Sequence, residues 1–306
     1  MSDIRIGISG WRYAPWRGDF YPRGLLQRLE LKFASRAVNS IEINGSFYAL
    51  QTPARYAQWH EDAPANFVFA VKAPRHITHV RRLRDIEEPL ANFFASGLFQ
   101  LREKLGPILW QFPPSLRFDA ERFGRFLELL PADNASAKAC ARHCSGHMEK
   151  AGSHDIPSHG ELRHAVEIRN DSFLCDEFID LLRRHKVALV VADSAGKWPY
   201  VEDLTSTFVY LRLHGDKELY ASGYSAKALA RWEQRIRLWS RGGQPEDAHL
   251  VSTRQPRPRK SRDVYCYFDN DIKVRAPYDA RNLLERLDLA DELETVPGEP
   301  GTADKL

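Results

Sequence analysis

Eight short apolar runs recur along the whole chain, and this repetition restricts the possible fold more than any other feature. Each run has the length of a β-strand, and segments with the apolar spacing of amphipathic helices separate most of them. Strands that alternate with helices pair in parallel, and eight such units predict a closed (β/α)8 TIM barrel, class α/β, rather than an open sheet. The predicted strands begin at Ile4, Ser40, Phe67, Pro107, His164, Val187, Phe208 and Asp263.

Helices are predicted over residues 89–105, 119–130, 172–186, 225–239 and 278–287. Two connections do not follow this pattern. Residues 195–207 show no helical spacing, so we expect an irregular crossover between the sixth and seventh strands. Residues 134–163 are polar and rich in His, and we expect a helix end followed by a long surface loop.

The length and composition fit one large domain. A barrel of this kind accounts for most of the 306 residues, of which 43% are hydrophobic and 28% charged. We therefore expect a single barrel domain over residues 1–290. Residues 291–306 have the polar, Pro- and Gly-containing composition of a disordered tail.

The overall charge argues against a dedicated nucleic-acid binder. The chain has 44 basic and 41 acidic residues and a net charge of +3, so nucleic acid remains open as a partner but is not favoured. No apolar stretch approaches the roughly 18 residues of a membrane span, and no signal segment opens the chain. We expect a cytoplasmic protein with no membrane partner and with its four cysteines reduced. The sequence does not indicate an oligomeric state.

Side chains alternate across a strand, and this alternation separates two sets of residues. The apolar set is expected to face the helices, and it comprises Ile41, Ile43, Phe69, Val71, Val166, Ile168, Val190, Ala192, Leu211 and Leu213. The opposite set is expected to face the barrel interior, and it comprises Glu42, Asn44, Lys72, Gln111, Glu167, Arg169, Asp193, Arg212 and His214. Ser9, Asp269 and Asn270 lie at strand ends and join this set with an orientation that the pattern does not determine.

The polar set lies toward the carboxyl ends of the strands, where barrel enzymes carry their active sites. Burial of so many unpaired charges would cost several kcal/mol each, so they must pair with one another or meet a ligand. An internal salt-bridge network is one interpretation, and a site for a small-molecule ligand is the other. Polar residues from six strands, or from eight with Ser9, Asp269 and Asn270, at one end of a barrel favour the ligand site.

Seven sequence motifs also resemble those of a known family. In chain order they are ISGWRYAPWRGDFYP, IEINGSFY, FAVKAPRHITH, LGPILWQFPPSL, AVEIRNDSF, YLRLHG and YFDND. This set is similar to the motifs of the YecE-like family, also called domain of unknown function 72, from about Ile4 to Leu287. The resemblance implies a TIM barrel distantly similar to the superfamily of xylose isomerase and endonuclease IV, and it implies no particular reaction.

The residues support three hypotheses. The first is an enzyme that acts on a small anionic or sugar-like ligand. Its catalytic acid/base residues would be Glu42, Glu167, Asp193 and His214, because neighbouring charges separate the pKa values of such groups. Its ligand-binding residues would be Trp11, Tyr13, Asn44, Lys72, His79, Gln111, Arg169, Arg212 and Asn270. In this hypothesis Lys72, Arg212 and His214 form an anion-binding cluster. The aromatic loop around Trp11 and Tyr13 stacks on the ligand or packs over the mouth.

The second hypothesis is a metal-dependent phosphodiesterase acting on nucleic acid, which rests only on the likeness to endonuclease IV. Such sites need many imidazoles, and here only His214 and His79 are expected near the mouth. The third hypothesis is a non-catalytic receptor for a small ligand. No cofactor is required by the sequence, which leaves open a single divalent metal held by Glu42, Glu167 and Asp193.

Two further segments resemble functional sites, but we assign them no metal or catalytic role. Cys140, His143, Cys144 and His147 would share one helix face, but four ligands on one helix cannot surround an ion tetrahedrally, and we expect a solvated segment. The basic run at residues 255–262 is expected to be a solvated loop that could touch phosphate.

Overall fold

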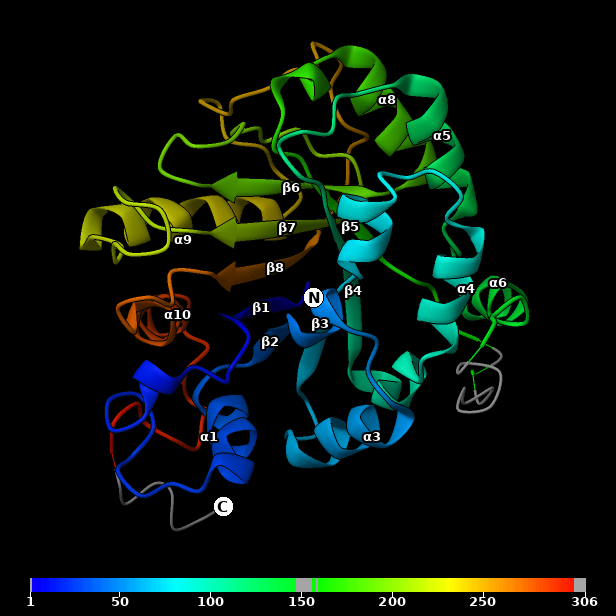
Figure 1. Cartoon of the computed structure of the whole chain (residues 1–306). Coiled ribbons are helices and arrows are strands. Elements are labelled where there is room, and N and C mark those ends of the chain that lie inside the picture. Colours follow the sequence, from blue (N-terminus) through cyan, green and yellow to red (C-terminus); the bar gives the residue numbers. More distant parts are fainter. Residues whose placement is uncertain (1, 147–155, 158, 300–306) are drawn as a thin grey trace.

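The protein is a closed barrel of eight parallel strands surrounded by helices (Figure 1). The computed structural model describes residues 2–146, 156–157 and 159–299. Each strand pairs in parallel with its neighbour in sequence, and β8 closes the barrel against β1. The strands are β1 (Ile4–Ser9), β2 (Ser40–Ile43), β3 (Val68–Lys72), β4 (Leu105–Gln111), β5 (His164–Glu167), β6 (Ala188–Asp193), β7 (Phe208–Leu213) and β8 (Asp263–Phe268). The predicted (β/α)8 TIM barrel is confirmed.

The helices lie outside the barrel and bury their apolar sides against the strands (Figure 1). They are α1 (Glu30–Ala37), α2 (Gly45–Tyr48), α3 (Pro53–Asp62), α4 (Glu87–Ala95), α5 (Ala120–Leu129), α6 (Asn134–Ala141), α8 (Asp176–His185), α9 (Ala226–Ser240) and α10 (Arg275–Arg286). Side-chain caps begin several of them, since Asp119 accepts from the backbone of Arg122 and Ser225 accepts from that of Ala228.

The long helix predicted over residues 89–105 is broken. α4 ends at Ala95, and a separate 3-10 segment spans Leu98–Lys104. Gly97 between them has φ +94°, and a Cβ there would lie 2.5 Å from the Cα of Pro53. The left-handed backbone and this close approach both require glycine, so the helical pattern could not continue through it.

Two more predicted elements differ in detail. The helix predicted at 172–186 is a 3-10 turn (Asp171–Phe173) followed by α8. The polar segment that begins at residue 134 opens with a true helix, α6, started by a capping box between Asp133 and Ser136. α6 packs against α4, whereas the remainder of this stretch includes residues 147–155 and 158, which lie outside the described residues.

The connection between β6 and β7, residues 194–207, contains no helix, as expected. The composition of the C-terminal stretch favours disorder. In the structure, however, residues 291–299 lie beside α1 (Figure 1). The side chain of Thr295 is buried and donates to the carbonyl of Phe33 at 2.9 Å, and the backbone of Glu294 donates to that of Arg36. These bonds to α1 fix the segment despite its polar composition.

The barrel interior becomes more polar toward the carboxyl ends of the strands. Phe208 and Tyr265 pack at 5.8 Å near the start of β7 and β8, and Tyr210 and Tyr267 pack at 5.2 Å one layer above them. The two hydroxyl groups of the second layer point to polar partners, Glu42 for Tyr210 and Ser40 for Tyr267. The next layer along β7 is Arg212, which begins the mouth. No described helix is long and apolar enough to cross a membrane.

Candidate functional site at the barrel mouth

Arg212 lies at the centre of the mouth and binds three carboxylates. It is fully buried on β7. Its Nε and Nη2 donate to Glu42 at 3.1 and 2.9 Å, its Nη1 donates to Glu167 at 2.7 Å, and its Nη2 also lies 2.9 Å from Asp269. An anionic ligand would have to compete with these carboxylates for the guanidinium. This geometry therefore does not favour the predicted role of Arg212 in anion binding.

Glu42 and Glu167 each accept hydrogen bonds from several further donors. Glu42 also accepts from Ser9 at 2.8 Å and from Tyr210 at 2.7 Å. Glu167 also accepts from Gln111 at 3.0 Å and from Arg169 at 2.8 Å. Burial alone would raise the pKa of Glu167, but the charges of Arg212 and Arg169 outweigh it and hold that pKa well below its ordinary range. These two carboxylates therefore build an ion-pair network, the first of the two interpretations of the polar set.

Asp269 joins this network and lies next to His214. Burial opposes its ionisation, but the Arg212 charge and the His214 ring lower the pKa of Asp269 below its ordinary value. His214 Nδ1 lies 2.9 Å from Asp269 Oδ2, and His214 Nε2 lies 3.9 Å from Glu167 Oε1. Neither contact has the geometry of a hydrogen bond.

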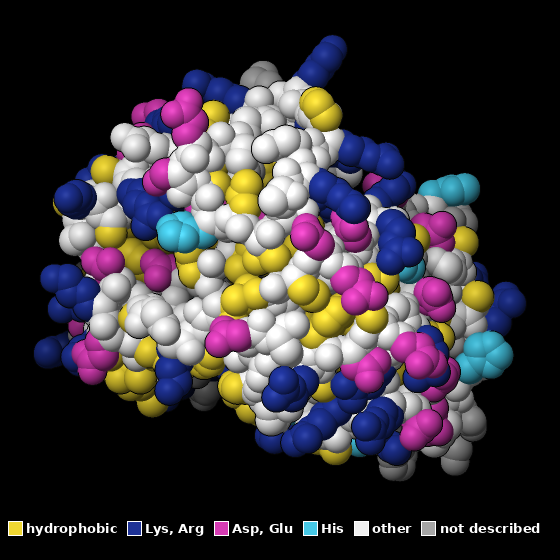
Figure 2. All heavy atoms as spheres, turned by 90° about the horizontal axis from the view of Figure 1, so that it is seen from above, with side chains coloured by type: hydrophobic (Ala, Val, Ile, Leu, Met, Phe, Trp, Pro, Cys, Tyr) yellow, Lys and Arg dark blue, Asp and Glu magenta, His cyan; other side chains and the backbone are white. Residues whose placement is uncertain are grey.

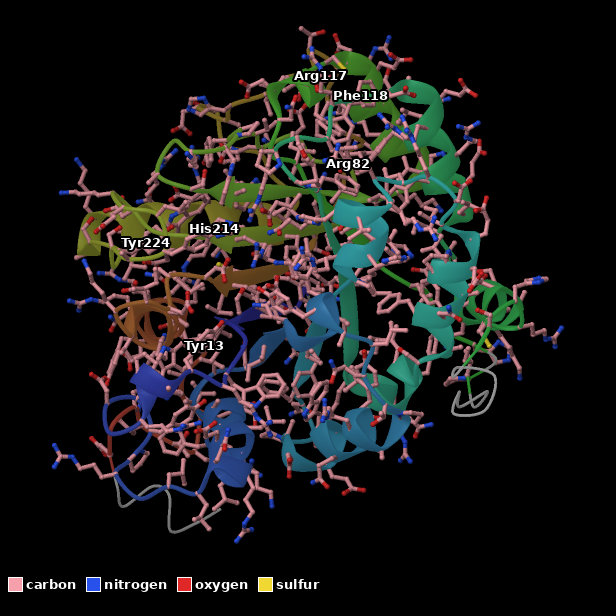
Figure 3. The ribbon with its side chains drawn as sticks, in the orientation of Figure 1. Tyr13, Arg82, Arg117, Phe118, His214 and Tyr224 are labelled. Atoms are coloured by element: carbon pink, nitrogen blue, oxygen red, sulfur yellow. The ribbon has the colours of Figure 1, made fainter. Side chains whose placement is uncertain are left out.

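His214 follows the carboxyl end of β7 (Figure 3) and is fully buried. The rings of Trp198 and Tyr220 each lie 5.5 Å from its ring. The turn that follows needs Gly215, which has φ +129°, and a Cβ there would lie 2.3 Å from the carbonyl of Glu218. His214 therefore faces the network, and a ligand would reach it only if Trp198 or Tyr220 moved.

Lys72 is the cation of the mouth without an anionic partner. It ends β3, is 8% exposed, and its Nζ lies 4.3 Å from the centre of the Phe47 ring. Within the described residues, no carboxylate lies within 4.0 Å of Nζ, and Nζ donates no hydrogen bond. Burial lowers the pKa of Lys72 to about 8, assisted by Arg212 and partly opposed by Glu42.

His79 shares the Phe47 ring with Lys72, at a ring separation of 5.1 Å. It belongs to a π-helical turn, His76–Val80, directly after β3, and its Nδ1 lies 2.8 Å from Thr78 Oγ1. Burial and the neighbouring charges of Lys72 and Arg169 lower the pKa of His79 to about 4. The imidazole is therefore neutral at physiological pH, with Nε2 directed away from Thr78.

Arg169 completes this upper layer of the mouth. Its Nε pairs with Glu167, while its guanidinium carbon lies 3.6 Å from the centre of the Trp198 ring. Its Nη2 lies 3.5 Å from the hydroxyl of Tyr220. The side chain is 11% exposed, so one edge of the guanidinium borders solvent. Three basic side chains, Lys72, His79 and Arg169, thus lie close enough to influence one another above the paired network.

The predicted inward orientation of Asp193 is wrong. On β6, Val190 and Ala192 pack inside the barrel with Tyr210, so Asp193 falls on the opposite side. Its Oδ2 accepts from the Tyr224 hydroxyl at 3.2 Å, and burial raises its pKa. The strand is apolar on both faces, so alternation carried no orientation signal there. Glu42, Glu167 and Asp193 therefore do not converge on a common metal position.

Asn270 and Asn44 differ in their surroundings. Asn270 turns away from the mouth, because its amide donates to the carbonyl of Ser222 and to Asp279 of α10 at 2.9 and 2.8 Å. It does not join the other predicted ligand-binding residues. Asn44 lies after β2 at the start of α2, and its buried Oδ1 has no hydrogen-bond partner within the part of the chain described. That orphaned oxygen is available to a ligand.

Trp11 and Tyr13 sit in a packed aromatic loop. Trp11 meets Trp59 of α3 edge to face at 5.2 Å, and the hydroxyl of Tyr13 donates to the carbonyl of Ser9 at 2.5 Å. Burial raises the pKa of Tyr13 above its ordinary value. Both residues border a cavity of about 960 Å³ between α1 and α3 that reaches Asn44. Packing explains most of this loop, and Figure 3 shows Tyr13 away from His214.

The segment with Cys140, His143 and Cys144 is not a solvated face. Cys144 is buried and Cys140 is half-buried, and burial raises the pKa of the Cys140 thiol to about 11. His147 lies outside the described residues. No group of three or more His, Cys, Asp or Glu side chains within the described ranges is arranged to hold a metal ion.

The basic run at residues 255–262 lies at the other end of the barrel, before β8 begins. With Arg183, Arg184 and Lys186 it borders a cavity of about 950 Å³. The face seen from above in Figure 2 mixes basic and acidic side chains with apolar ones, in accord with the small net charge. The run therefore has no part in the mouth.

Several residues of the mouth were not predicted from the sequence. Trp198 and Tyr220 come from irregular segments that follow β6 and β7, where no periodic pattern indicates which side chains turn inward. Phe47 looked like part of a strand but lies on α2. Asp269, in contrast, was included from the sequence because it lies at the end of a predicted strand beside the polar Asn270.

The chain is a single-domain (β/α)8 TIM barrel with charged side chains at the mouth formed by the carboxyl ends of its strands. It belongs to the family described as "Protein of unknown function DUF72", whose model matches residues 5–303. The resemblance noted in the sequence motifs is confirmed.

Relatives of the family support the same assignment. The chain is 26% identical to the UPF0759 protein YunF of Bacillus subtilis, over 94% of this chain and 95% of that protein. It is 27% identical to the UPF0759 protein YecE of Escherichia coli, over 42% of this chain and 45% of that protein.

Two solved structures share the fold. A DUF72 family protein from Thermotoga maritima has a TM-score of 0.71 at 23% identity, covering 94% of this chain and 99% of its own. A DUF72 family protein from Enterococcus faecalis has a TM-score of 0.64 at 17% identity, with the same coverage. At these identities the likeness supports the barrel and carries no function.

Proposed function

We propose that this protein is an enzyme that binds a small anionic or sugar-like ligand at the barrel mouth and performs acid/base chemistry on it. The observation that supports this proposal most is the upper layer of the mouth. There Lys72, His79 and Arg169 lie near one another, and the carboxylates below them are already bound by Arg212. An anion would balance the positive charges of Lys72 and Arg169 beside the neutral His79 ring.

The two layers have different tasks in this proposal. Glu42, Glu167 and Asp269 keep Arg212 fixed, and this network forms a rigid floor that is closed to ligands. Lys72 and the open edge of Arg169 hold the anionic group of the ligand. His79 presents its free Nε2 to the ligand, as a neutral imidazole that can accept or donate a proton. Asn44 adds an unpaired amide oxygen at the rim.

This arrangement revises the acid/base assignment made from the sequence. Glu167 is stabilised as an anion by two arginines and is a poor proton donor near neutral pH. His214 is enclosed beneath Trp198 and Tyr220. His79 is half-buried and borders Lys72, so it is the imidazole better placed to act on a bound ligand.

Calorimetric titration with inorganic phosphate tests the binding part of the proposal. We expect saturable binding to the intact protein and at least tenfold weaker binding to Lys72→Met. Lys104→Met is the matched control, because Lys104 is also buried but donates to the carbonyls of His60 and Ala63 away from the mouth. Equal phosphate affinity in the intact protein and Lys72→Met would contradict the anion site.

A metabolite screen tests the catalytic part. The intact protein is expected to convert an anionic metabolite, and His79→Gln is expected to bind the same compound with little conversion. Binding of a metabolite without turnover by the intact protein would instead identify a receptor.

A further inference from the structure

We infer that Lys72 forms an imine with the carbonyl carbon of the substrate, so that the ligand class of the mouth is a small aldehyde or ketone that also carries an anionic group. This inference rests on the proposed function, because Arg169 of the same mouth would hold the anionic group while the Lys72 amine attacks the carbonyl. It adds a covalent step and a substrate class to that function.

The position of Lys72 separates it from other buried cations of the chain. Arg212 is bound to three carboxylates, and Lys104 Nζ donates to two backbone carbonyls at 2.6 and 2.9 Å. Lys72 Nζ, in contrast, rests on the face of the Phe47 ring and has no acceptor within the described residues. A lysine whose nitrogen makes no ion pair or hydrogen bond within the described residues is free to present its lone pair once it loses a proton.

The surroundings of Lys72 favour the loss of its proton. Burial against Phe47 and the charge of Arg212 lower its pKa to about 8. At pH 7 about one amine in ten is then unprotonated, compared with fewer than about one in a thousand for an ordinary lysine side chain. Desolvation next to a second cation is a known route to a nucleophilic lysine.

The chemical step balances without an oxidant or reductant. The Nζ lone pair attacks the carbonyl carbon, the π electrons move to the carbonyl oxygen, and a proton passes from nitrogen to that oxygen to give a carbinolamine. A second proton, taken from solvent, is delivered to the hydroxyl group, and water leaves as the nitrogen lone pair forms the C=N bond of a protonated imine. His79 packs against the Phe47 ring that Lys72 also contacts, at a ring separation of 5.1 Å, and as a neutral imidazole it can relay these protons. Hydrolysis returns the free lysine.

Reductive trapping with two small aldehydes tests the inference. Glyoxylate carries an aldehyde and a carboxylate, and glycolaldehyde carries an aldehyde and no charge. Each is incubated with the full chain at pH 7.5 and reduced with cyanoborohydride, and the modified lysines are mapped by peptide mass spectrometry. We expect glyoxylate to modify Lys72 at least tenfold faster than the exposed Lys217 and the buried Lys104.

Two variants separate the covalent step from anion binding. Lys72→Arg keeps the positive charge and cannot form an imine, so it should bind phosphate and acquire no adduct at residue 72. Lys72→Met should lose both properties. Excess phosphate should slow the glyoxylate reaction at Lys72 and leave the glycolaldehyde reaction less affected.

The outcomes distinguish the two claims. If both aldehydes modify Lys72 no faster than Lys217, the imine inference is overturned, even where phosphate binding depends on Lys72. If both aldehydes modify Lys72 selectively but phosphate neither binds nor protects, the imine inference holds and the anion site of the proposed function fails.

Discussion

Replacement of Lys72 by methionine should stabilise the protein, because its buried ammonium lacks an anionic partner. The pKa of Lys72 falls from its ordinary 10.5 to about 8 in the fold, a difference that corresponds to about 3 kcal/mol of folding free energy at neutral pH. Loss of the contact with Phe47 would cost about 0.5 to 1 kcal/mol. We therefore expect Lys72→Met to raise the free energy of unfolding by about 2 kcal/mol at pH 7.

The gain should depend on pH in a defined direction. Between about pH 8 and 10.5 the unfolded chain binds a proton at Lys72 that the folded chain has released, so the stability of the intact protein rises with pH in this window. Lys72→Met lacks this group. The stability difference between the two proteins should therefore be largest below pH 8 and should shrink as the pH rises toward 10.

Urea unfolding followed by tryptophan fluorescence at pH 7 and pH 9.5 measures both effects. Lys104→Met is the matched control and should destabilise the fold by about 2 to 4 kcal/mol, since it leaves two buried carbonyls without their donor. If Lys72→Met is destabilised as strongly as this control, Lys72 is a paired structural cation and the reasoning is refuted.

Four other predictions concern Arg212, the carboxylates that it binds, Asp193 and the C-terminal residues. Arg212→Met leaves three buried carboxylates without their cation and should lower the free energy of unfolding by about 3 to 5 kcal/mol, measured by urea denaturation. Because the pKa values of Glu167 and Asp269 are lowered in the fold, their contribution to stability should be full above about pH 4 and be lost as the pH falls further, in an acid-unfolding series. Asp193→Asn should change stability by less than about 1 kcal/mol and leave phosphate affinity unchanged, because burial already disfavours the charged form and an amide oxygen can still accept from Tyr224. Removal of the residues from 291 onward should cost about 1 to 3 kcal/mol in the same assay, because it removes the bonds of Glu294 and Thr295 to α1.

The fold was accessible from the sequence because its signals are local. Strand-length apolar runs and amphipathic spacing indicated all eight strands, and alternation oriented β2, β5 and β7, whose two faces differ sharply in polarity. It failed on β6, where Val190, Val191 and Ala192 are apolar on both faces and only Asp193 stood out. The break at Gly97 depends on the close approach of Pro53, a contact that no local pattern contains.

The site was only partly accessible, because its chemistry depends on which charges pair. Residue types and strand ends brought Glu42, Glu167, Lys72 and Arg212 to one mouth. Nothing in the sequence distinguished a bound arginine from an unpaired lysine, since that difference arises from side-chain lengths and distances across the barrel. The lowered pKa of Lys72 follows from its burial and from the nearby charge of Arg212.

The pKa of Lys72, measured with and without phosphate, tests the central claim most directly. Isotope-labelled lysine NMR can follow the Lys72 signal, assigned by its absence in Lys72→Met. We predict a pKa near 8 without ligand and a higher value with phosphate bound, because a neighbouring anion favours the ammonium. A pKa of 10 or above that phosphate does not change would contradict an unpaired, anion-binding Lys72 at the barrel mouth.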